Sequence, residues 1–324
     1  MRRIFLNDVG RMRSGWRALL FCAAVAVISI LLATVLRFGY VLLLNFGPSR
    51  PYAPFVADLI FRFTILGTAL GAGYLCARWL ENLPWRSLGL TFHQGWVRDL
   101  LIGCAIGFAA LAVAVGIAAA AGGLRFSFDG GSGVAMPLLR SFVGTLVILF
   151  VAALAEEALF RGYGLQTLAR AKLAWLGLLL TSVPFGLAHL SNPNVVFVAT
   201  FTNTALAGVW LGVAYLRTRS LWFPLGVHWS WNWALGWFFG LPVSGKNLPH
   251  PLLTGNDLGP AWLTGGSYGI EGGVACTIAL TIFTIFVWRT RWVSATPELK
   301  KLTSEENPVV PSPALSIRPT EDAA

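Results

Sequence analysis

Two adjacent glutamates, Glu156 and Glu157, end an apolar run that has no charged residue after Arg140. Glu157 and Arg161 are four residues apart, so in a helix they share a face and can form an ion pair. Glu156 is rotated from Glu157 by about 100° around a helix, which leaves it outside that pair. A carboxylate without a counter-ion can take a proton from water, as a general base must. The simpler alternative places both glutamates at a membrane surface, where water solvates them.

Two histidines and an asparagine extend this set of polar residues. His189 ends the segment "PFGLAHL", one turn after Phe185, and His228 in "GVHWSWNW" is followed four residues later by Asn232. A lone histidine in an apolar helix is more often a packed core residue than a catalyst. Two such histidines, one with an asparagine four residues later, are harder to dismiss when the glutamate pair is considered with them.

Glu156, His189 and His228 could also bind zinc, because catalytic zinc sites use three protein ligands and a water. The compact HExxH pattern of many zinc peptidases is absent from the sequence. A metal-independent mechanism based on the glutamate therefore stays open beside the metal-dependent one. The two histidines could also ligate haem, although that reading leaves the glutamates unexplained.

These polar residues lie in a chain with the composition of a membrane protein. Of its 324 residues, 56% are hydrophobic and 12% are charged, whereas soluble domains have about 25% charged residues. Apolar stretches of about 20 residues recur along the sequence, as in membrane-spanning helices. We therefore predict an all-α bundle with a polar cavity near its cytoplasmic side and eight transmembrane helices, at about 18–37, 55–77, 99–121, 137–160, 173–190, 194–216, 221–240 and 272–290.

The distribution of charge predicts the orientation of this bundle. With the N-terminus in the cytoplasm, 18 of the 24 lysines and arginines fall on the inner side, where positive residues concentrate. The net charge of +10 is thus explained by topology, and we expect the lipid bilayer, not nucleic acid, as a partner. The expected protein is a multi-pass protein of a bacterial inner or cell membrane with both termini in the cytoplasm. In this scheme His189 falls at the outer end of its helix, away from Glu156, so the boundaries of that helix conflict with a shared site.

The chain divides into one predicted membrane domain and a tail. We expect residues 1–292 to form the transmembrane helical domain, in which the polar residues described above fall in a core at about 137–240 that could extend to 290. From 293 the sequence becomes polar and rich in proline, which predicts a disordered cytoplasmic tail over 293–324.

Three motifs in order make the chain resemble the CPBP family, the type II CAAX prenyl endopeptidases and the Abi, or bacteriocin-processing, membrane proteins. The family pattern is EExxxR, FxxxH and HxxxN, which here corresponds to Glu156 to Arg161, Phe185 to His189, and His228 to Asn232. Each motif alone is a weak signal, but their order on successive apolar segments is fairly specific. The "YGIEGG" segment at 268–273 is also similar to the family, without a role assigned to Glu271.

The resemblance implies a bundle of about eight helices in which the motif residues converge on a cavity. Glu156 matches the residue that activates water, His189 the histidine that helps to hold it, and His228 with Asn232 the pair that stabilises the oxyanion. Glu157 and Arg161 match the supporting part of the first motif. Family members are called metalloproteases, yet a metal-independent mechanism is also argued for them. The implied substrate is a peptide or protein, prenylated in some members.

Two other classes of function fit some of these features. A non-enzymatic immunity or scaffold protein could use the same fold, because fold does not fix function. A proton-coupled transporter could also place glutamate and histidine within the membrane.

Overall fold

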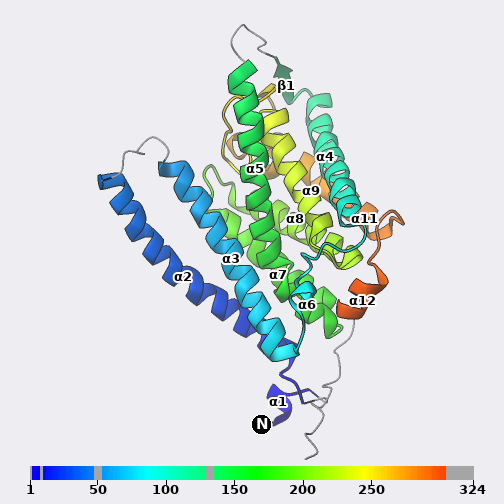
Figure 1. Cartoon of the computed structure of the whole chain (residues 1–324). Coiled ribbons are helices and arrows are strands. Elements are labelled where there is room, and N and C mark those ends of the chain that lie inside the picture. The colour runs from blue at the N-terminus through cyan, green and yellow to red at the C-terminus, as the bar shows by residue number, and fades with distance from the viewer. Residues whose placement is uncertain (1, 8–9, 47–52, 129–134, 304–324) are drawn as a thin grey trace, which may run out of the picture.

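The computed structural model describes residues 2–7, 10–46, 53–128 and 135–303, and these residues form a bundle of helices (Figure 1). The long helices have these bounds: α2 Ser14–Phe46, α3 Ala53–Glu81, α4 Trp96–Ala120, α5 Ala135–Phe160, α7 Ala174–Ala188, α8 Phe197–Thr218, α9 Trp222–Trp233 and α11 Val274–Arg289. The shorter helices are α1 Arg2–Phe5, α6 Tyr163–Arg170, α10 Ala261–Thr264, α12 Pro297–Thr303, the 3₁₀ helices η2 Trp85–Leu88, η3 His189–Ser191, η5 Gly266–Tyr268 and η6 Ile270–Gly272, and the π-helix η4 Ala234–Phe238.

A small antiparallel sheet lies beyond one end of the long helices. Strand β1, Leu124–Ser127, follows α4, and strand β2, Thr254–Asp257, belongs to the long loop between η4 and α11. Leu124 pairs with Asp257 and Ser127 with Thr254. The sheet therefore ties this long loop to the end of α4.

Six of the described helices are long and apolar enough to cross a membrane: Ser14–Gly39, Val56–Glu81, Trp96–Ala120, Ala135–Arg170, Ala174–Ser191 and Phe197–Thr218. Helix α11 is apolar but shorter, and α9 reaches a comparable length only when its π-helical continuation is included. Each of the eight segments expected from the sequence coincides with one of these helices. The all-α membrane bundle is thus confirmed, and eight is an approximate number of spans.

Helices α4 and α9 lie in the core of the bundle with parts of α8 and α11, and the backbones of α4 and α9 approach closely at glycines. A Cβ atom on Gly107 would collide with the backbone oxygen of Val227, and one on Gly226 would collide with the backbone oxygen of Leu100. Small residues at such positions let two membrane helices pack in direct contact. This contact fixes the place of α9, which carries His228.

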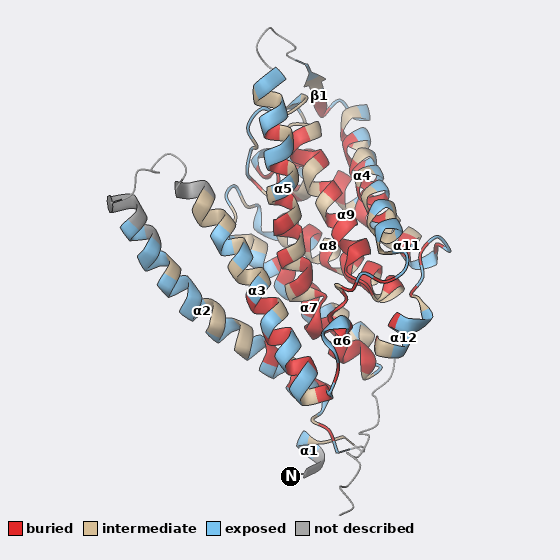
Figure 2. Ribbon diagram, viewed as in Figure 1, coloured by how far each residue is buried: buried red, intermediate tan, exposed pale blue. Residues whose placement is uncertain are grey.

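Helices α2 and α3 form a pair on one side of the core. In Figure 2, α2 is exposed along most of its length, whereas α9 is largely buried and α5 is buried mainly toward its C-terminal end. The upper part of this pair diverges from α5, and α3 approaches α5 lower down (Figure 1). The exposed side chains of α2 are apolar, as expected for a surface that faces lipid.

A buried ionic cluster closes the end of the bundle where α2 begins and α3 ends. The Glu81 carboxylate lies 2.7 Å from Arg17 Nη1 and 2.5 Å from Arg170 Nη2, and all three side chains are fully buried. Arg17, one of the basic residues whose distribution predicts the orientation, is thus part of the folded core. The cluster joins α2, α3 and α6.

The first part of the predicted disordered tail is folded against the same end. Helix α12 buries Leu299 completely, and its Glu298 forms a 2.8 Å ion pair with Arg86 of η2. The expectation of disorder from 293 is therefore wrong for residues 293–303, where apolar burial and an ion pair hold the chain. Residues 304–324 lie outside the described residues.

Candidate functional site

The last turns of α5 place the two glutamates in different surroundings. The side chain of Glu157 is fully buried, whereas that of Glu156 is 30% exposed. The Oε2 atom of Glu156 is itself buried and accepts no hydrogen bond from the described residues. Glu156 thus lies outside the pair of Glu157 with Arg161, as expected, but its Oε2 is 3.7 Å from His228 Nε2, a contact that the spacing did not indicate.

Glu157 connects two helices through one carboxylate oxygen. Its Oε1 accepts a 3.0 Å hydrogen bond from Arg161 Nη1 and lies 2.8 Å from His228 Nδ1 on α9. Arg161 also donates to the backbone oxygen of Gly208 at 3.1 Å. The i, i+4 pair predicted from the sequence is therefore confirmed, and it includes a third partner, His228, that the spacing did not indicate.

The aromatic ring of Phe185 packs at the centre of the motif residues. The Arg161 guanidinium carbon lies 4.5 Å from the centre of this ring, which is cation–π distance. The rings of His189 and His228 have their centres 4.6 Å and 6.1 Å from that of Phe185. The phenylalanine of the second motif thus packs against Arg161 and both imidazoles, while Arg161 and His228 meet at the Glu157 carboxylate.

His189 lies at the C-terminal end of α7, and its Nδ1 is 2.8 Å from the backbone oxygen of Phe185. A carbonyl oxygen only accepts, so Nδ1 carries the hydrogen in this contact. In the neutral ring, Nε2 is then left as an acceptor. His189 can therefore accept a hydrogen bond from a water molecule in the adjacent cavity.

Asn232 follows His228 by four residues on α9 and shares its face. Its side chain makes no hydrogen bond within the described part of the chain and lines the same cavity as His228. The helix widens into the π-helix η4 immediately afterwards, at Ala234, and such π segments are frequent at functional sites. At the other end of α9, Pro224 falls in the first turn, where a proline costs no helical hydrogen bond.

All four candidate residues line one cavity of about 570 Å³. Glu156 comes from α5, His189 from the end of α7, and His228 and Asn232 from α9. The sequence expectation that these residues share a cavity despite their separation is met. The volume lies in the range of about 300–1,000 Å³ that is usual for sites of small ligands and short peptides.

The unexpected helix α6 explains how His189 reaches this cavity. After Glu156 the chain continues through α6, whose Arg170 binds Glu81 at the end of the bundle. Helix α7 begins only after α6, and its 15 residues extend about 22 Å along the helix axis. Its C-terminal end thus returns to the level of Glu156, and the conflict in the sequence-based topology came from omitting α6.

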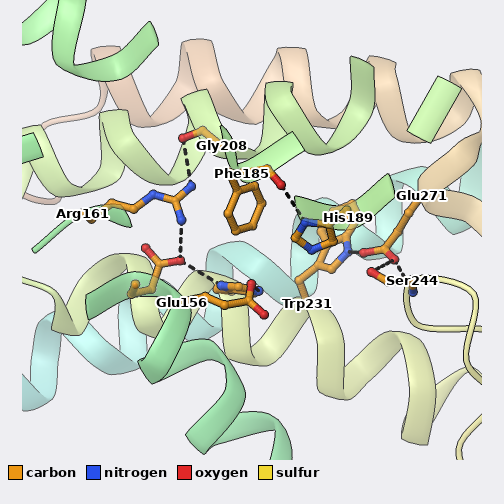
Figure 3. A network of polar contacts seen from close by, with 10 residues as sticks. Glu156, Arg161, Phe185, His189, Gly208, Trp231, Ser244 and Glu271 are labelled. Carbon is orange, nitrogen blue, oxygen red and sulfur yellow. Dashed lines mark hydrogen bonds and ion pairs between the residues drawn. The ribbon is translucent and has the colours of Figure 1, made fainter. Parts of the chain in front are cut away.

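Glu271 is a further polar residue of the cavity to which the sequence analysis assigned no role. Its Oε1 accepts a 3.1 Å hydrogen bond from Trp231 Nε1, and its Oε2 accepts bonds from Ser244 N at 2.6 Å and Ser244 Oγ at 3.0 Å (Figure 3). Asn203 of α8 donates to the backbone oxygen of Glu271 at 2.8 Å. The carboxylate therefore ties the loop at 244 to α9. Its place in "YGIEGG" was the available signal.

The proposed metal ligands do not form a metal site. Within the described residues, no group of three or more histidine, cysteine, aspartate and glutamate side chains is arranged to hold a metal ion. Both histidines direct Nδ1 to an oxygen atom, that of Glu157 for His228 and the backbone oxygen of Phe185 for His189, which leaves Nε2 of each ring available. Metal-binding histidines make the same kind of Nδ1 contact. The misfit to a shared zinc ion therefore lies in the arrangement of the three side chains, which do not group as three ligands within the described residues.

The fold and the cavity define an integral membrane helical bundle with a buried polar site. Residues 137–234 match the model of a protein family described as Rce1-like type II CAAX prenyl endopeptidases. The matched segment contains all three motifs and the four candidate residues. This match supports the resemblance to the CPBP proteases that the three motifs indicate. No curated protein matches the chain.

Proposed function

We propose that the protein is an intramembrane endopeptidase that hydrolyses a peptide bond near the cytoplasmic membrane face by direct attack of water. The observation that carries the proposal is the convergence of Glu156, His189, His228 and Asn232 on one cavity. Isolated polar groups within a membrane are costly, and their shared position in a cavity is typical of a functional site. The family match supports a CAAX-type protease activity.

In this mechanism Glu156 and His189 activate the water. The Glu156 carboxylate takes a proton from the water, and Nε2 of His189 accepts the other hydrogen and holds the molecule in place. The water oxygen then forms a bond with the carbonyl carbon of the peptide. The proton held by Glu156 passes to the amide nitrogen, and the carbon–nitrogen bond breaks to release an amine.

Asn232 and His228 act on the carbonyl oxygen, which becomes negative during the attack. The amide of Asn232 donates one hydrogen bond to it, and Nε2 of His228 donates the second. Because Nδ1 of His228 already binds Glu157, a hydrogen on both ring nitrogens requires the protonated ring. The role as oxyanion donor therefore assigns the imidazolium form to His228, with Glu157 as its counter-ion.

The substrate of this proposal is a peptide or protein in the membrane. Two more specific substrates fall within this proposal: a prenylated protein of the CAAX type and a peptide of the bacteriocin type. They can be separated with matched peptides that differ only in a prenyl group on cysteine. A preference of more than tenfold in kcat/KM for the prenylated peptide would support a CAAX-type substrate.

The experiment that tests the function compares peptides from membranes of cells that produce either the wild-type protein or Glu156→Gln. We expect cleaved peptides that appear with the wild type and are missing with the variant at equal protein level. Identical peptide profiles would contradict the peptidase and would favour the non-enzymatic or transport alternatives. The transport alternative would then be tested by proton uptake into vesicles that contain the purified protein.

A further inference from the structure

Arg37 is a charged residue on the apolar helix α2 that no anionic group of the described chain compensates. Residues 18–36, which precede it, contain no charged side chain. The side chain of Arg37 is exposed and forms no ion pair or hydrogen bond with the described residues. A charge on a membrane-spanning helix is costly unless it reaches water or a partner. A negative group from outside the described residues would therefore stabilise it.

The position of Arg37 along α2 corresponds to the level of lipid phosphate groups. Arg17 belongs to the buried cluster at one end of the bundle, and Arg37 lies about 30 Å further along the same helix. On α3, Ile60 lies about 32 Å along the helix from Glu81, the partner of Arg17. The hydrocarbon core of a bilayer is about 30 Å thick. A tilt of α2 shortens the first distance, and the long arginine side chain can extend to the surface.

An apolar groove between α2 and α3 begins beside Arg37. Its volume is about 340 Å³, and the residues from α2 that line it run from Ser29 to Gly39. This stretch measures about 15 Å along the helix, which is half of the hydrocarbon thickness and thus the depth of one leaflet. Arg37 is the one charged residue among the described residues that line the groove. The groove therefore has the length of an acyl chain and a positive charge at one end.

The groove differs from the remainder of the lipid-facing surface of α2. Ile30 and Val35 are each 66% exposed and do not line it. Such scattered apolar side chains contact the bulk lipid without selecting a particular molecule. A hollow that is combined with an uncompensated guanidinium, in contrast, can select a ligand both by its chain and by its charge.

We propose that this groove binds one anionic phospholipid, with the phosphate on Arg37 and an acyl chain between α2 and α3. A guanidinium group can donate two parallel hydrogen bonds to phosphate oxygens. No acidic side chain is among the described residues that line the groove, so the amine of a zwitterionic headgroup finds no partner there. A lipid with net negative charge, such as phosphatidylglycerol, is therefore the expected ligand.

The lipid site lies next to the polar cavity but is separate from it. Phe61 and Ile65 of α3 line both the groove and the cavity, so they form a shared wall. Arg37 does not line the cavity, and Glu156 does not line the groove. An acyl chain in the groove would contact the shared wall from the lipid side. The proposal concerns a resident lipid and does not depend on the proposed peptidase activity.

The test measures lipid binding to the purified protein in a lipid-free detergent by native mass spectrometry. The probes are dioleoylphosphatidylglycerol, dioleoylphosphatidylethanolamine, dioleoylglycerol, which has the same chains without phosphate, and inorganic phosphate, which has no chains. We expect the first phosphatidylglycerol molecule to bind at least about tenfold more tightly than dioleoylglycerol, as for a hydrogen bond to a charged group. Phosphatidylethanolamine should bind more weakly than phosphatidylglycerol, and inorganic phosphate should not bind measurably.

Variants of the charge assign this preference to Arg37. Arg37→Met should lower the affinity for phosphatidylglycerol to that for dioleoylglycerol, and Arg37→Lys should retain part of the preference. Because the side chain is exposed, neither change should lower the melting temperature of the lipid-free protein. Arg125→Met is the matched control, because it removes an exposed arginine that does not line the groove. It should leave the preference unchanged.

A second pair of variants tests the place of the acyl chain. Ala33→Phe puts a large ring into the groove and should weaken phosphatidylglycerol and dioleoylglycerol alike. Val35→Phe adds the same ring on α2 outside the groove and should weaken neither. A thermal-shift measurement gives an independent readout, because a ligand that binds only the folded state raises its melting temperature. Phosphatidylglycerol should raise the melting temperature of the wild type and of Val35→Phe, but not that of Arg37→Met.

Four results would overturn the proposal. Equal binding of phosphatidylglycerol and dioleoylglycerol would show that the phosphate is not recognised, and a preference that survives Arg37→Met would place it elsewhere. Unchanged binding to Ala33→Phe, or binding of inorganic phosphate as tight as that of the lipid, would remove the groove from the site. Equal binding of phosphatidylethanolamine would contradict the selection of a net negative lipid.

Discussion

The Nδ1 atom of His228 lies 2.8 Å from Oε1 of Glu157, although 71 positions separate the two residues in the chain. The same oxygen lies 3.0 Å from Arg161, and all three side chains are buried. This contact joins α9 to the end of α5 and sets the orientation of the His228 ring. Glu157 is therefore the residue on which both the packing and the proposed oxyanion donor depend.

Glu157→Gln should lower both the stability and the activity of the protein. The amide lacks the negative charge that compensates Arg161 and His228 in a buried site, and breaking a buried ion pair costs about 3–5 kcal/mol. The measurement is the melting temperature in detergent together with the cleavage rate of a peptide substrate. A variant that melts and cleaves like the wild type would contradict the bridging role of Glu157.

The double variant Glu157→Gln/Arg161→Gln serves as the control for this effect. Removal of the arginine charge should recover part of the lost melting temperature, because the uncompensated buried charge is gone. Activity should not recover, since His228 still lacks its carboxylate. If the changes in melting temperature caused by the two single substitutions simply add in the double variant, a direct coupling between Glu157 and Arg161 is contradicted.

Gly226→Ala should displace α9 and reduce activity. A Cβ at this position collides with the backbone oxygen of Leu100 on α4, and overpacking of this kind costs about 1–3 kcal/mol. Gly116→Ala in α4 is the matched control, because nothing lies within 4 Å of its Cβ position. We expect Gly116→Ala to melt at or above the wild-type temperature, and a similar loss in both variants would contradict the close packing of α4 with α9.

Glu81→Gln should strongly destabilise the bundle. The change removes the carboxylate that binds two buried guanidinium groups, those of Arg17 and Arg170, at a cost of about 3–5 kcal/mol. Glu298→Gln, at an ion pair in which both side chains are 47% exposed, should cost about 0–1 kcal/mol. Thermal unfolding of the two variants side by side provides the measurement, and equal shifts would count against the buried cluster.

Both ends of the chain should lie on the cytoplasmic side. The structure places the start of α2 and helix α12 at the same end of the bundle, where Arg17 binds Glu81 and Glu298 binds Arg86 of η2 (Figure 1). The positive residues favour the cytoplasm for this end. Reporter fusions at the two termini give the measurement, and signals from opposite sides of the membrane would refute the arrangement.

The membrane helices could be predicted because each is an apolar run of sufficient length. Helix α6 could not, because its eight residues include Gln166, Thr167 and Arg170, which read as a polar loop. These side chains are all buried by contacts with α2, α3 and α7, and Arg170 is compensated by Glu81. A polar segment is buried only when it meets partners that are distant in the sequence. The local pattern of residues carries no information about those partners.

In the candidate site, contacts within one chain segment could be predicted from the sequence, whereas contacts between distant segments could not. The pair of Glu157 and Arg161 follows from helical spacing, because both residues belong to one chain segment. The contact of Glu157 with His228 arises only when α5 packs against α9. Glu271 lies in a 3₁₀ turn among glycines, where no periodicity points to its partners. Its bonds to Trp231 and Ser244 follow from the fold of the long loop.

The most direct test of the account is the cleavage rate of Glu156→Gln on a peptide substrate identified from the membrane profiles. The amide keeps the size of the side chain but cannot take a proton from water, and general bases contribute about 10²–10⁴-fold to rates. We predict a loss of at least about 100-fold in kcat with a melting temperature close to that of the wild type, because Oε2 of Glu156 accepts no hydrogen bond from the described residues. Cleavage by Glu156→Gln at near the wild-type rate would contradict Glu156 as the base.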